Sequence, residues 1–564
     1  MCQLFFGCSL LQWIRESDLS RAHAFNQVAD RALALRQNRR VLLGASAAGV
    51  AALLGSTLRW QGAAAQEGTK ISFGVNYDTA LFDHLRSSTT PFASPLVFEN
   101  LVIRADDGSW APWVAESWTE AEDGLKTTFK LRQGIVFHDG TPLDAEAVKW
   151  FFDKARDPEG EHGFSSSYAS VTDVIAEDDA TVTFTFSSPF AGFMDTISSS
   201  FAGLISPTAY EQAGDQFGVS VVIGSGPFKL KSWTPNDTMV LERYEEYTWA
   251  PTALTANAGP AQAQTIEAKV LTEAATAVAA LETSQIDVLF GTSVQDYERL
   301  KDSSDITFLT TPKYGGDLLY MNMHMDRGPF QDINVRKAVN LAVDKVGIAA
   351  AVFRDIAGTP AYGYLPPHFE AHFPDAESIG YPYNEDLAKQ TLEDAGWVEQ
   401  GGVREKDGAQ LSFKLIVGNA PEFVATVQIV QANLEAIGIK TEVVTNTSTA
   451  TLEMAKGGDF DIYMGRWGYG SPDVLNFFFP SDAANNRSKI NDPQLDAMLE
   501  AATMAPTIEE RNAKFMEVDK YLIEQAYWCP IVFETDLVAV RSNVTGFGFN
   551  QFGDTTYPTD WNKL

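Results

Sequence analysis

Residues 411–444 contain a strand, a helix and a second strand at the spacing of a βαβ unit. Residues 411–417 (LSFKLIV) and 439–444 (IKTEVV) have a strand-forming composition. Residues 422–436 between them have a helical pattern, which Gly438 ends. A helical connection of this length joins strands that run parallel to each other. The sequence therefore predicts an α/β protein with a sheet that is at least partly parallel.

Strand-like runs and helical patterns alternate along the chain from Gln66 onward, without a sequence repeat. Alternating apolar residues predict strands over 71–76, 125–131 and 180–186.

Two further helices are predicted in the second half of the chain. The clearer one covers 332–348, where apolar residues recur at helical spacing: Val335, Ala338, Val339, Ala342, Val343 and Val346. The other covers 384–396, with Gly396 as its C-cap.

His138 stands next to Asp139 in the stretch LRQGIVFHDGTPLDAEAVKWFFDKA (131–155), after a run predicted to be a strand up to Phe137. A catalytic histidine needs a nucleophile or a metal partner, and the chain has no GxSxG, HExxH or Cys–His signature. Asp139 and Gly140 supply turn chemistry instead. We therefore expect a structural turn at His138.

The helix after this turn has two candidate starts. Thr141 is one N-cap, with Pro142 at the first helical position, and Asp144 is the other, three residues later. Either start gives one apolar stripe, formed by Ala147, Val148, Phe151, Phe152 and Ala155.

Residues 38–65 have the order of an export signal. Asn38-Arg39-Arg40 precedes an uncharged run at 41–58, and Ala63-Ala64-Ala65 offers a cleavage site before Gln66. The adjacent arginines resemble a twin-arginine signal. A membrane anchor is the alternative, but the run is rich in Ala, Gly and Ser, which contribute little transfer energy. The sequence predicts a cleaved signal peptide and a periplasmic protein.

Residues 1–37 are unusual for a signal peptide, so either the start is misassigned or the charged region is long. Cys2 and Cys8 fall in this segment, which leaves Cys529 alone in the mature chain and predicts no internal disulfide. No cysteine stands beside the cleavage site, which argues against a lipid anchor.

The predicted mature chain is strongly acidic. Without residues 1–65 it has 35 basic and 71 acidic side chains, a net charge of about −36 with His neutral. Such a surface repels nucleic acids and anionic membranes. The length of 564 residues and the 45% hydrophobic content predict a globular chain of two or three domains.

Six stretches, taken in order, resemble the family 5 extracellular solute-binding proteins, the dipeptide-, oligopeptide- and nickel-binding group that feeds ABC importers. The stretches are PLVFENLV (95–102), WVAESWTEAEDGLKTTFKLRQGIVFHDGTPLDAEAV (113–148), GSGPFKL (224–230), INVRKAVNLAVDK (333–345), YNEDLAKQTLEDAGW (383–397) and FDIYMGRWGYGSPD (460–473). The resemblance implies a type II periplasmic binding fold, with two α/β lobes joined by hinge crossovers and an extra domain inserted in the first lobe.

This resemblance also implies a division of the chain. The N-terminal extension and signal occupy 1–65. The first lobe (domain I) comprises 66–106, 223–311 and 526–564, domain II comprises 107–222, and the second lobe (domain III) comprises 312–525.

A ligand that lies between the lobes must contact both of them in order to favour the closed state. The resemblance implies that the closed form then engages a membrane permease. The candidate ligand-binding residues are Tyr77, Phe92, Gly224 and Ser225 in the first lobe, and Tyr320, Asn322, Arg466, Trp467, Tyr469 and Asp473 in the second lobe.

The turn Gly224-Ser225-Gly226 is a candidate because glycines leave backbone N–H and C=O groups accessible to a polar ligand. Trp467 and Tyr469 are interleaved with glycines, which favours a cleft over core packing.

Arg466 is either a cleft residue or a solvated charge, and Asp473 is either a cleft residue or a helix cap. The family's peptide binders have an acidic residue three places after the matching tryptophan, where it captures the peptide amino terminus. Gly470 occupies that place in this chain. The absence of this carboxylate weakens the interpretation as a peptide binder. We expect a small polar solute, peptide-like or related, with a sugar, an opine or a metal complex as alternatives.

A resident metal or cofactor is not expected. His368 and His372 are bracketed by prolines, which disfavours a helix that presents both side chains on one face. Met321, Met323 and Met325 alternate as on one face of a strand, which suggests packing more than a soft-metal site.

The leading hypothesis is a monomeric binding receptor without catalysis. A secreted hydrolase with paired acids is the alternative from another class, but no recognisable pair arrangement occurs. A chaperone or signalling role is a third hypothesis.

Overall fold

The computed structural model describes residues 69–564 except 77, 79–80, 88–91, 158–164, 313–316, 469 and 551–552. Glu67–Leu564 form one compact unit. The predicted signal at 38–65, with Cys2 and Cys8 before it, lies outside the described residues. Among the described helices, none has the length and apolar character to cross a membrane.

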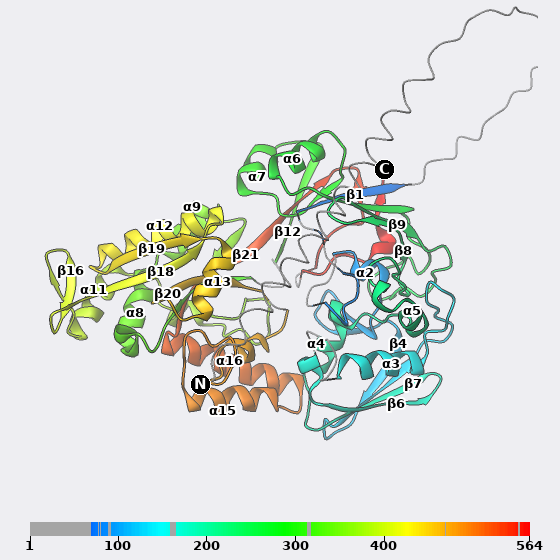
Figure 1. The fold of residues 1–564 in the computed structure, drawn as a ribbon, viewed down its shortest axis with the longest axis horizontal. Helices are drawn as coiled ribbons and strands as arrows, with labels where there is room; N and C mark the ends of the chain where they lie inside the picture. The colour runs from blue at the N-terminus through cyan, green and yellow to red at the C-terminus, as the bar shows by residue number, and fades with distance from the viewer. Residues whose placement is uncertain are drawn as a thin grey trace, which may run out of the picture. The chain divides into compact units, whose positions relative to one another are not determined.

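The central feature of the described residues is a mixed sheet of 12 strands, which all connect through strand β21 (Trp528–Arg541). Its first seven residues pair with β13 (Leu318–Met323) and β14 (Gly358–Pro360). Its last seven pair with β12 (Ile306–Pro312) and β11 (Val288–Leu289). Figure 1 shows β21 running from one set of strands to the other.

We call the strands on the β11 side the β1 half. It contains β1 (Lys70–Val75) parallel to β10 (Thr265–Val270), followed by the antiparallel strands β9 (Thr238–Arg243) and β8 (Phe228–Thr234). The strand predicted over 71–76 is therefore confirmed. Its apolar side chains are buried, which is typical of a strand covered on both faces.

We call the strands on the other side of β21 the β13 half. It contains β18 (Ser412–Gly418), the parallel neighbours β19 (Lys440–Asn446) and β20 (Ile462–Trp467), and β13. Helix α12 (Pro421–Ala436) connects β18 to β19. The predicted βαβ unit and parallel pairing are confirmed. Gly438 follows α12 with φ +80°, in the left-handed region that favours glycine.

A separate antiparallel sheet forms in the segment between β1 and β8. Its order is β4 (Ala115–Glu120), β5 (Lys126–Leu131), β7 (Thr181–Phe186) and β6 (Val171–Asp178), which confirms the strands predicted over 125–131 and 180–186. Helix α3 (Ala145–Ala155) packs on this sheet with its predicted apolar stripe buried. The side chains of this layer share one hydrophobic cluster with the β1 half.

The strand predicted up to Phe137 is wrong, because β5 ends at Leu131 and only an isolated bridge joins Val136 to Pro142. Asp144 is the N-cap of α3, since its carboxylate accepts a hydrogen bond from the N–H of Ala147. The alternative cap at Thr141 is thereby excluded.

The single helix predicted over 332–348 is also wrong. Two helices form, α8 (Ile333–Ala342) and α9 (Lys345–Val352), with Val343 in an extended conformation between them. Asp344 caps α9 by accepting from the N–H of Gly347, so local capping interrupts the helical periodicity. Val346 is consequently 56% exposed and not part of the core.

The helix predicted over 384–396 is present as α11 (Glu385–Asp394), with Asn384 as its N-cap and Ala395 as its C-cap. Gly396 follows the C-cap with φ +85°. The other helices are α2 (Ser94–Val97), α4 (Phe193–Ser198), α5 (Pro207–Ala213), α6 (Ala274–Glu282), α7 (Val294–Leu300), α10 (Ala376–Ile379), α13 (Ser448–Lys456), α14 (Val474–Phe478), α15 (Pro493–Thr503) and α16 (Ile508–Gln525). The short strands are β2 (Val102–Arg104), β3 (Trp110–Pro112), β15 (Val398–Gln400), β16 (Val403–Lys406), β17 (Ala409–Gln410), β22 (Val544–Thr545) and β23 (Asn562–Lys563).

A fully buried carboxyl group, Glu99, lies in the core of the β1 half. One of its oxygens, Oε1, accepts from Trp113 Nε1 at 2.9 Å and from the Tyr247 hydroxyl at 2.6 Å. The other oxygen, Oε2, accepts from Trp249 Nε1 at 2.7 Å and from Ser225 Oγ at 2.8 Å. The Tyr557 hydroxyl is a fifth donor, 3.4 Å from Oε1. Five donors from distant segments thus converge on one side chain, which fixes these segments relative to each other.

Burial raises the pKa of Glu99 from 4.5 to about 7, although the hydrogen bonds from Tyr247, Ser225, Trp249 and Trp113 act in the opposite direction. The folded protein therefore holds this proton at pH values where the unfolded chain has released it. Linkage then requires the free energy of unfolding to fall as the pH rises from about 4.5 to 7.

We predict that Glu99→Gln lowers stability at every pH. The amide nitrogen of Gln replaces a carboxylate oxygen that accepts hydrogen bonds, so its N–H groups face donors and not acceptors. The variant also lacks the proton linkage, so its free energy of unfolding should fall less between pH 5 and 8 than that of the wild type, by on the order of 2 kcal/mol. Urea unfolding at both pH values measures the difference. Equal pH dependence in the two proteins contradicts this role of Glu99.

Candidate functional site

The turn at Gly224-Ser225-Gly226 is packed against α2. A Cβ atom at Gly224 would collide with the carbonyl oxygen of Val97, and a Cβ at Gly226 would lie 2.7 Å from that of Leu96. The N–H of Gly226 donates to Val97 O at 2.9 Å, and Ser225 is fully buried. The glycines therefore permit close approach to α2, and part of the turn's backbone is used in internal hydrogen bonds.

His138 belongs to the same internal network. Its backbone N–H donates to Gly224 O at 2.8 Å, and its Nε2 donates to Gly226 O at 2.9 Å. Burial lowers the pKa of His138 to about 4, so the ring is neutral. Asp139 accepts instead from Thr141 and from Ser206 Oγ, the latter at 2.6 Å. The pair is a scaffold corner, as expected from the sequence.

Phe92 lies half-buried beside Phe73 and Phe290, at ring-centroid distances of 5.3 and 6.0 Å. Tyr77 and Tyr469, two further candidates, lie outside the described residues. Within the described part of the chain, the candidates Phe92, Gly224 and Ser225 therefore all contact the core of the β1 half.

An aromatic group forms where β13 meets β20 and β21. Tyr320 stacks on Trp528 with ring centroids 4.1 Å apart, and Trp467 meets Trp528 edge-on at 5.8 Å. Trp467 is only 8% exposed and also contacts Phe478 at 4.8 Å. A Cβ at Gly465 would lie 2.8 Å from the Tyr320 hydroxyl, so this glycine makes room for the phenol. Trp467 is thus largely packed, but the N–H at the edge of its indole ring has no partner among the described residues.

Trp467 Nε1 is buried and has no hydrogen-bond acceptor among the described residues. The same holds for Asn322 Nδ2, while Asn322 Oδ1 accepts from Ser488 Oγ at 2.7 Å. Trp467, Tyr320 and Asn322 share one face of the sheet, because Leu318 pairs with Trp467 and the strands alternate with a period of two. The structure therefore brings these three predicted residues together.

Arg466 points to the opposite face and is neutralised there. Its guanidinium lies 2.6 Å from Glu422, 2.9 Å from Glu534 and 3.9 Å from Asp317, and over the Phe423 ring at 4.9 Å. Three surrounding carboxylates keep it charged and hold it in place. These partners favour a structural role for Arg466 over either a solvated charge or an available ligand contact.

Asp473 precedes α14 but makes no side-chain cap there. Its carboxylate instead lies 2.5 Å from Arg511 of α16, a side chain that is 2% exposed. Arg511 also lies 3.5 Å from Asp195 of α4, which pairs in turn with Arg104. This chain of alternating charges connects the β13 half to the segment between β1 and β8.

The position after Tyr469 is open. A Cβ built at Gly470 meets no atom of the described residues within 4 Å, and its φ is not in the left-handed region. A side chain at this position is therefore tolerated on steric grounds.

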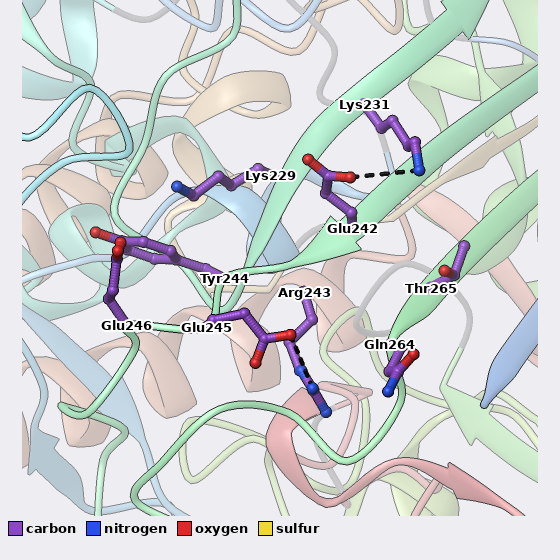
Figure 2. Close-up of a pocket in the computed structure, with 9 residues that line it drawn as sticks. All are labelled: Lys229, Lys231, Glu242, Arg243, Tyr244, Glu245, Glu246, Gln264 and Thr265. Atoms are coloured by element: carbon purple, nitrogen blue, oxygen red, sulfur yellow. Dashed lines mark hydrogen bonds and ion pairs between the residues drawn. The ribbon is translucent and has the colours of Figure 1, made fainter. Parts of the chain in front are cut away.

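A pocket of about 440 Å³ lies at the other end of the β1 half, along β8 and β9. Figure 2 shows Lys231 bonded to Glu242 and Arg243 bonded to Glu245, while Lys229 lies 3.8 Å from the centroid of the Tyr244 ring. None of the sequence-predicted site residues lines it. Its mixed and largely paired charges offer no preference for a ligand of either sign.

The described residues contain no group of three His, Cys, Asp or Glu side chains placed to hold a metal ion. His372 Nδ1 lies 2.8 Å from Leu365 O, and Met321 and Met323 are fully buried in the core of the β13 half.

Sequence reasoning missed Arg487, Arg511 and Trp528. Arg511 and Trp528 contact Asp195 and Tyr320, which lie far away in the chain, and no local pattern signals these contacts. Arg487 contacts the nearby Asn485 and Phe478, but no motif marks it. Only the unusual density of aromatic residues near Trp528 and Phe478 hinted at a shared cluster.

A family model for the middle region of the bacterial extracellular solute-binding proteins, family 5, matches residues 109–489. The glutathione-binding protein GsiB of Shigella flexneri serotype 5b (strain 8401) is 26% identical over 447 residues, which cover 77% of this chain and 82% of that protein.

Solved structures of the type II periplasmic binding fold superimpose on the chain. NikA from Brucella suis in complex with Fe(III)-EDTA gives a TM-score of 0.77 at 23% identity, covering 88% of this chain and 100% of NikA. The oligopeptide-binding protein AppA from Bacillus subtilis in complex with a nonapeptide gives 0.70 at 22% identity, covering 88% of this chain and 99% of AppA. The expected fold class is confirmed. Since the family model covers more than half of its length, this chain belongs to the bacterial extracellular solute-binding proteins, family 5.

Proposed function

We propose that this chain is the periplasmic substrate-binding receptor of an ABC importer and captures a small polar solute between its two sheet halves. The observation that carries the proposal is the change of strand partners along β21. The β1 half and the β13 half have separate hydrophobic clusters, and β21 contributes side chains to both. Two packed bodies on a shared strand form a hinged receptor, and a solute that contacts both bodies favours closure.

The proposal includes the domain division expected from the sequence, with domain II at 107–222 and the second lobe at 312–525. It also includes export by a cleaved signal peptide, action as a monomer with a membrane permease as partner, and no catalysis or nucleic-acid binding. The net charge of −32 supports the absence of nucleic-acid binding, because it disfavours contact with polyanions.

The ligand we propose is peptide-like or a related polar solute, with a sugar, an opine or a metal complex as alternatives. Relatives named for glutathione, a nonapeptide and Fe(III)-EDTA support this range. Gly470 supplies no carboxylate for an amino terminus, which favours solutes that are not recognised through an ammonium group.

Native mass spectrometry of the freshly purified protein should reveal a bound solute. Titration of that solute should change tryptophan fluorescence saturably and reduce the radius of gyration in small-angle scattering, without product formation. If the purified protein retains no solute, a panel of dipeptides, tripeptides, sugars, opines and metal chelates is titrated in its place. Turnover of any of them, or unchanged scattering with all of them, contradicts the proposal.

We predict that Gly470→Asp creates affinity for a free amino terminus. The new carboxylate has room and supplies a charge-assisted partner, so tripeptides should bind about tenfold more tightly than to the wild type, or about 1.4 kcal/mol. Gly470→Asn, which has the same shape without the charge, is the matched control. Isothermal titration with tripeptides and their N-acetyl derivatives measures the effect, and an equal gain for the acetylated compounds contradicts it.

We predict that Asp195→Asn weakens closure, because Arg511 then loses one of its two carboxylates while it stays buried. Ligand-free protein should show a larger radius of gyration, and the apparent solute affinity should fall about three- to tenfold. Asp215→Asn is the control, since Asp215 is fully exposed and contacts Arg86 at the surface. Equal scattering curves for the two variants contradict a role of this contact in closure.

A further inference from the structure

Arg487, in the segment between α14 and α15, is a half-buried cation with few partners. Its Nη2 donates to Asn485 Oδ1 at 3.1 Å, and its guanidinium lies 6.0 Å from the centroid of the Phe478 ring. Its Nε is buried without an acceptor, and no carboxylate of the described residues lies within ion-pair distance. Arg466 and Arg511 in the same half each have at least two carboxylates.

The surroundings of Arg487 contain further donors without acceptors. Phe478 contacts Trp467, and the neighbouring Ser488 bonds Asn322. Trp467 Nε1 and Asn322 Nδ2 are both buried and unpaired within the described residues. The positive charge of Arg487 also acts on the phenols of Tyr320 and Tyr463, where it opposes the rise in pKa that burial causes. Arg487 therefore lies close to the sheet face that carries these donors.

Unpaired buried donors are costly, and charged donors cost more. Three of them lie around one aromatic group, so a single external acceptor that bonds them would remove this cost. The guanidinium of Arg487 and the indole of Trp467 both contact the Phe478 ring, at 6.0 and 4.8 Å. The acceptor that matches a guanidinium fork and a further N–H donor is a planar group with two oxygens and a negative charge.

We infer that Arg487, together with the indole N–H of Trp467, forms a subsite for the carboxylate group of the transported solute. The inference rests on the proposed function and narrows the cargo to solutes that carry a carboxylate. It also gives the β13 half a specific ligand contact that Arg466 does not provide, because Arg466 is already neutralised.

The test uses the mature protein after extensive dialysis, with sodium acetate as the probe and sodium chloride at equal ionic strength as the reference. The indole ¹H–¹⁵N resonance of Trp467, assigned with Trp467→Phe, should shift saturably with acetate and not with chloride. Arg487→Gln should weaken the apparent acetate affinity at least tenfold, and Arg487→Lys should recover part of it.

Lys489→Gln removes the same charge two residues further along, at an exposed position, and should change the affinity less than twofold. Circular dichroism and thermal unfolding confirm that each variant is folded. A wild type without a saturable acetate shift, or an Arg487→Gln variant that matches it, overturns the inference.

The outcome is distinguishable from failure of the proposed function. If the solute panel closes the protein but Arg487→Gln binds every carboxylate solute normally, only the subsite is wrong. If acetate binds as expected while no solute changes the scattering, the subsite stands and the receptor function is wrong.

Discussion

Strand β21 is the constraint on which the rest of the structure depends. It is a continuous strand of 14 residues, about 46 Å long at the rise of an extended chain, and it is buried along most of its length. Its partners change between Phe533, which pairs with β13, and Thr535, which pairs with β12. A central strand cannot slip in register without exposing apolar side chains, so relative motion of the two halves is limited to twisting and bending near this change of partners.

Buried ionisable side chains complete the scaffold on both sides of β21. Glu99 gathers two tryptophans, two tyrosines and a serine in the β1 half, and Arg466 holds Glu422 and Glu534 together in the β13 half. Such groups are costly to bury unless every partner is in place, so they favour one arrangement over others more than they increase stability. Arg511 differs from Glu99 and Arg466 because its contacts with Asp195 and Asp473 connect segments that pack in separate hydrophobic clusters.

The sequence predicts those helices and strands that are determined by the pattern of neighbouring residues. The βαβ unit at 411–444 and the strands of the small antiparallel sheet follow from periodicity and from glycine at the helix end. The break at Asp344 does not follow from periodicity, because an aspartate side chain that caps the next helix outweighs a continuous apolar stripe. The glycines at 224 and 226 were expected to expose backbone groups, but they permit close packing on α2, a purpose that only the packed partner reveals.

Site residues are harder to predict, because the chemistry of a charged side chain depends on partners that are remote in sequence. Arg466 was a candidate and Arg487 was not, although the two lie 21 positions apart in the same half. The carboxylates that neutralise Arg466 come from Glu422 and Glu534, which no local motif connects to it. Tyr320 and Trp467, by contrast, were predicted from strand alternation and flanking glycines, and these features do place their side chains on one face.

The acidity of the chain bears directly on how it can bind an anion. With 74 acidic and 42 basic side chains, the long-range field repels negative solutes at low ionic strength. That field is screened over about 8 Å at physiological salt, so the local groups decide binding once a solute has entered. An arginine that already has carboxylate partners adds nothing to the local potential, whereas one without them adds a full positive charge in a region of low polarity. The assignment of an anion to Arg487 therefore follows from the distribution of the carboxylates around the other arginines as much as from Arg487 itself.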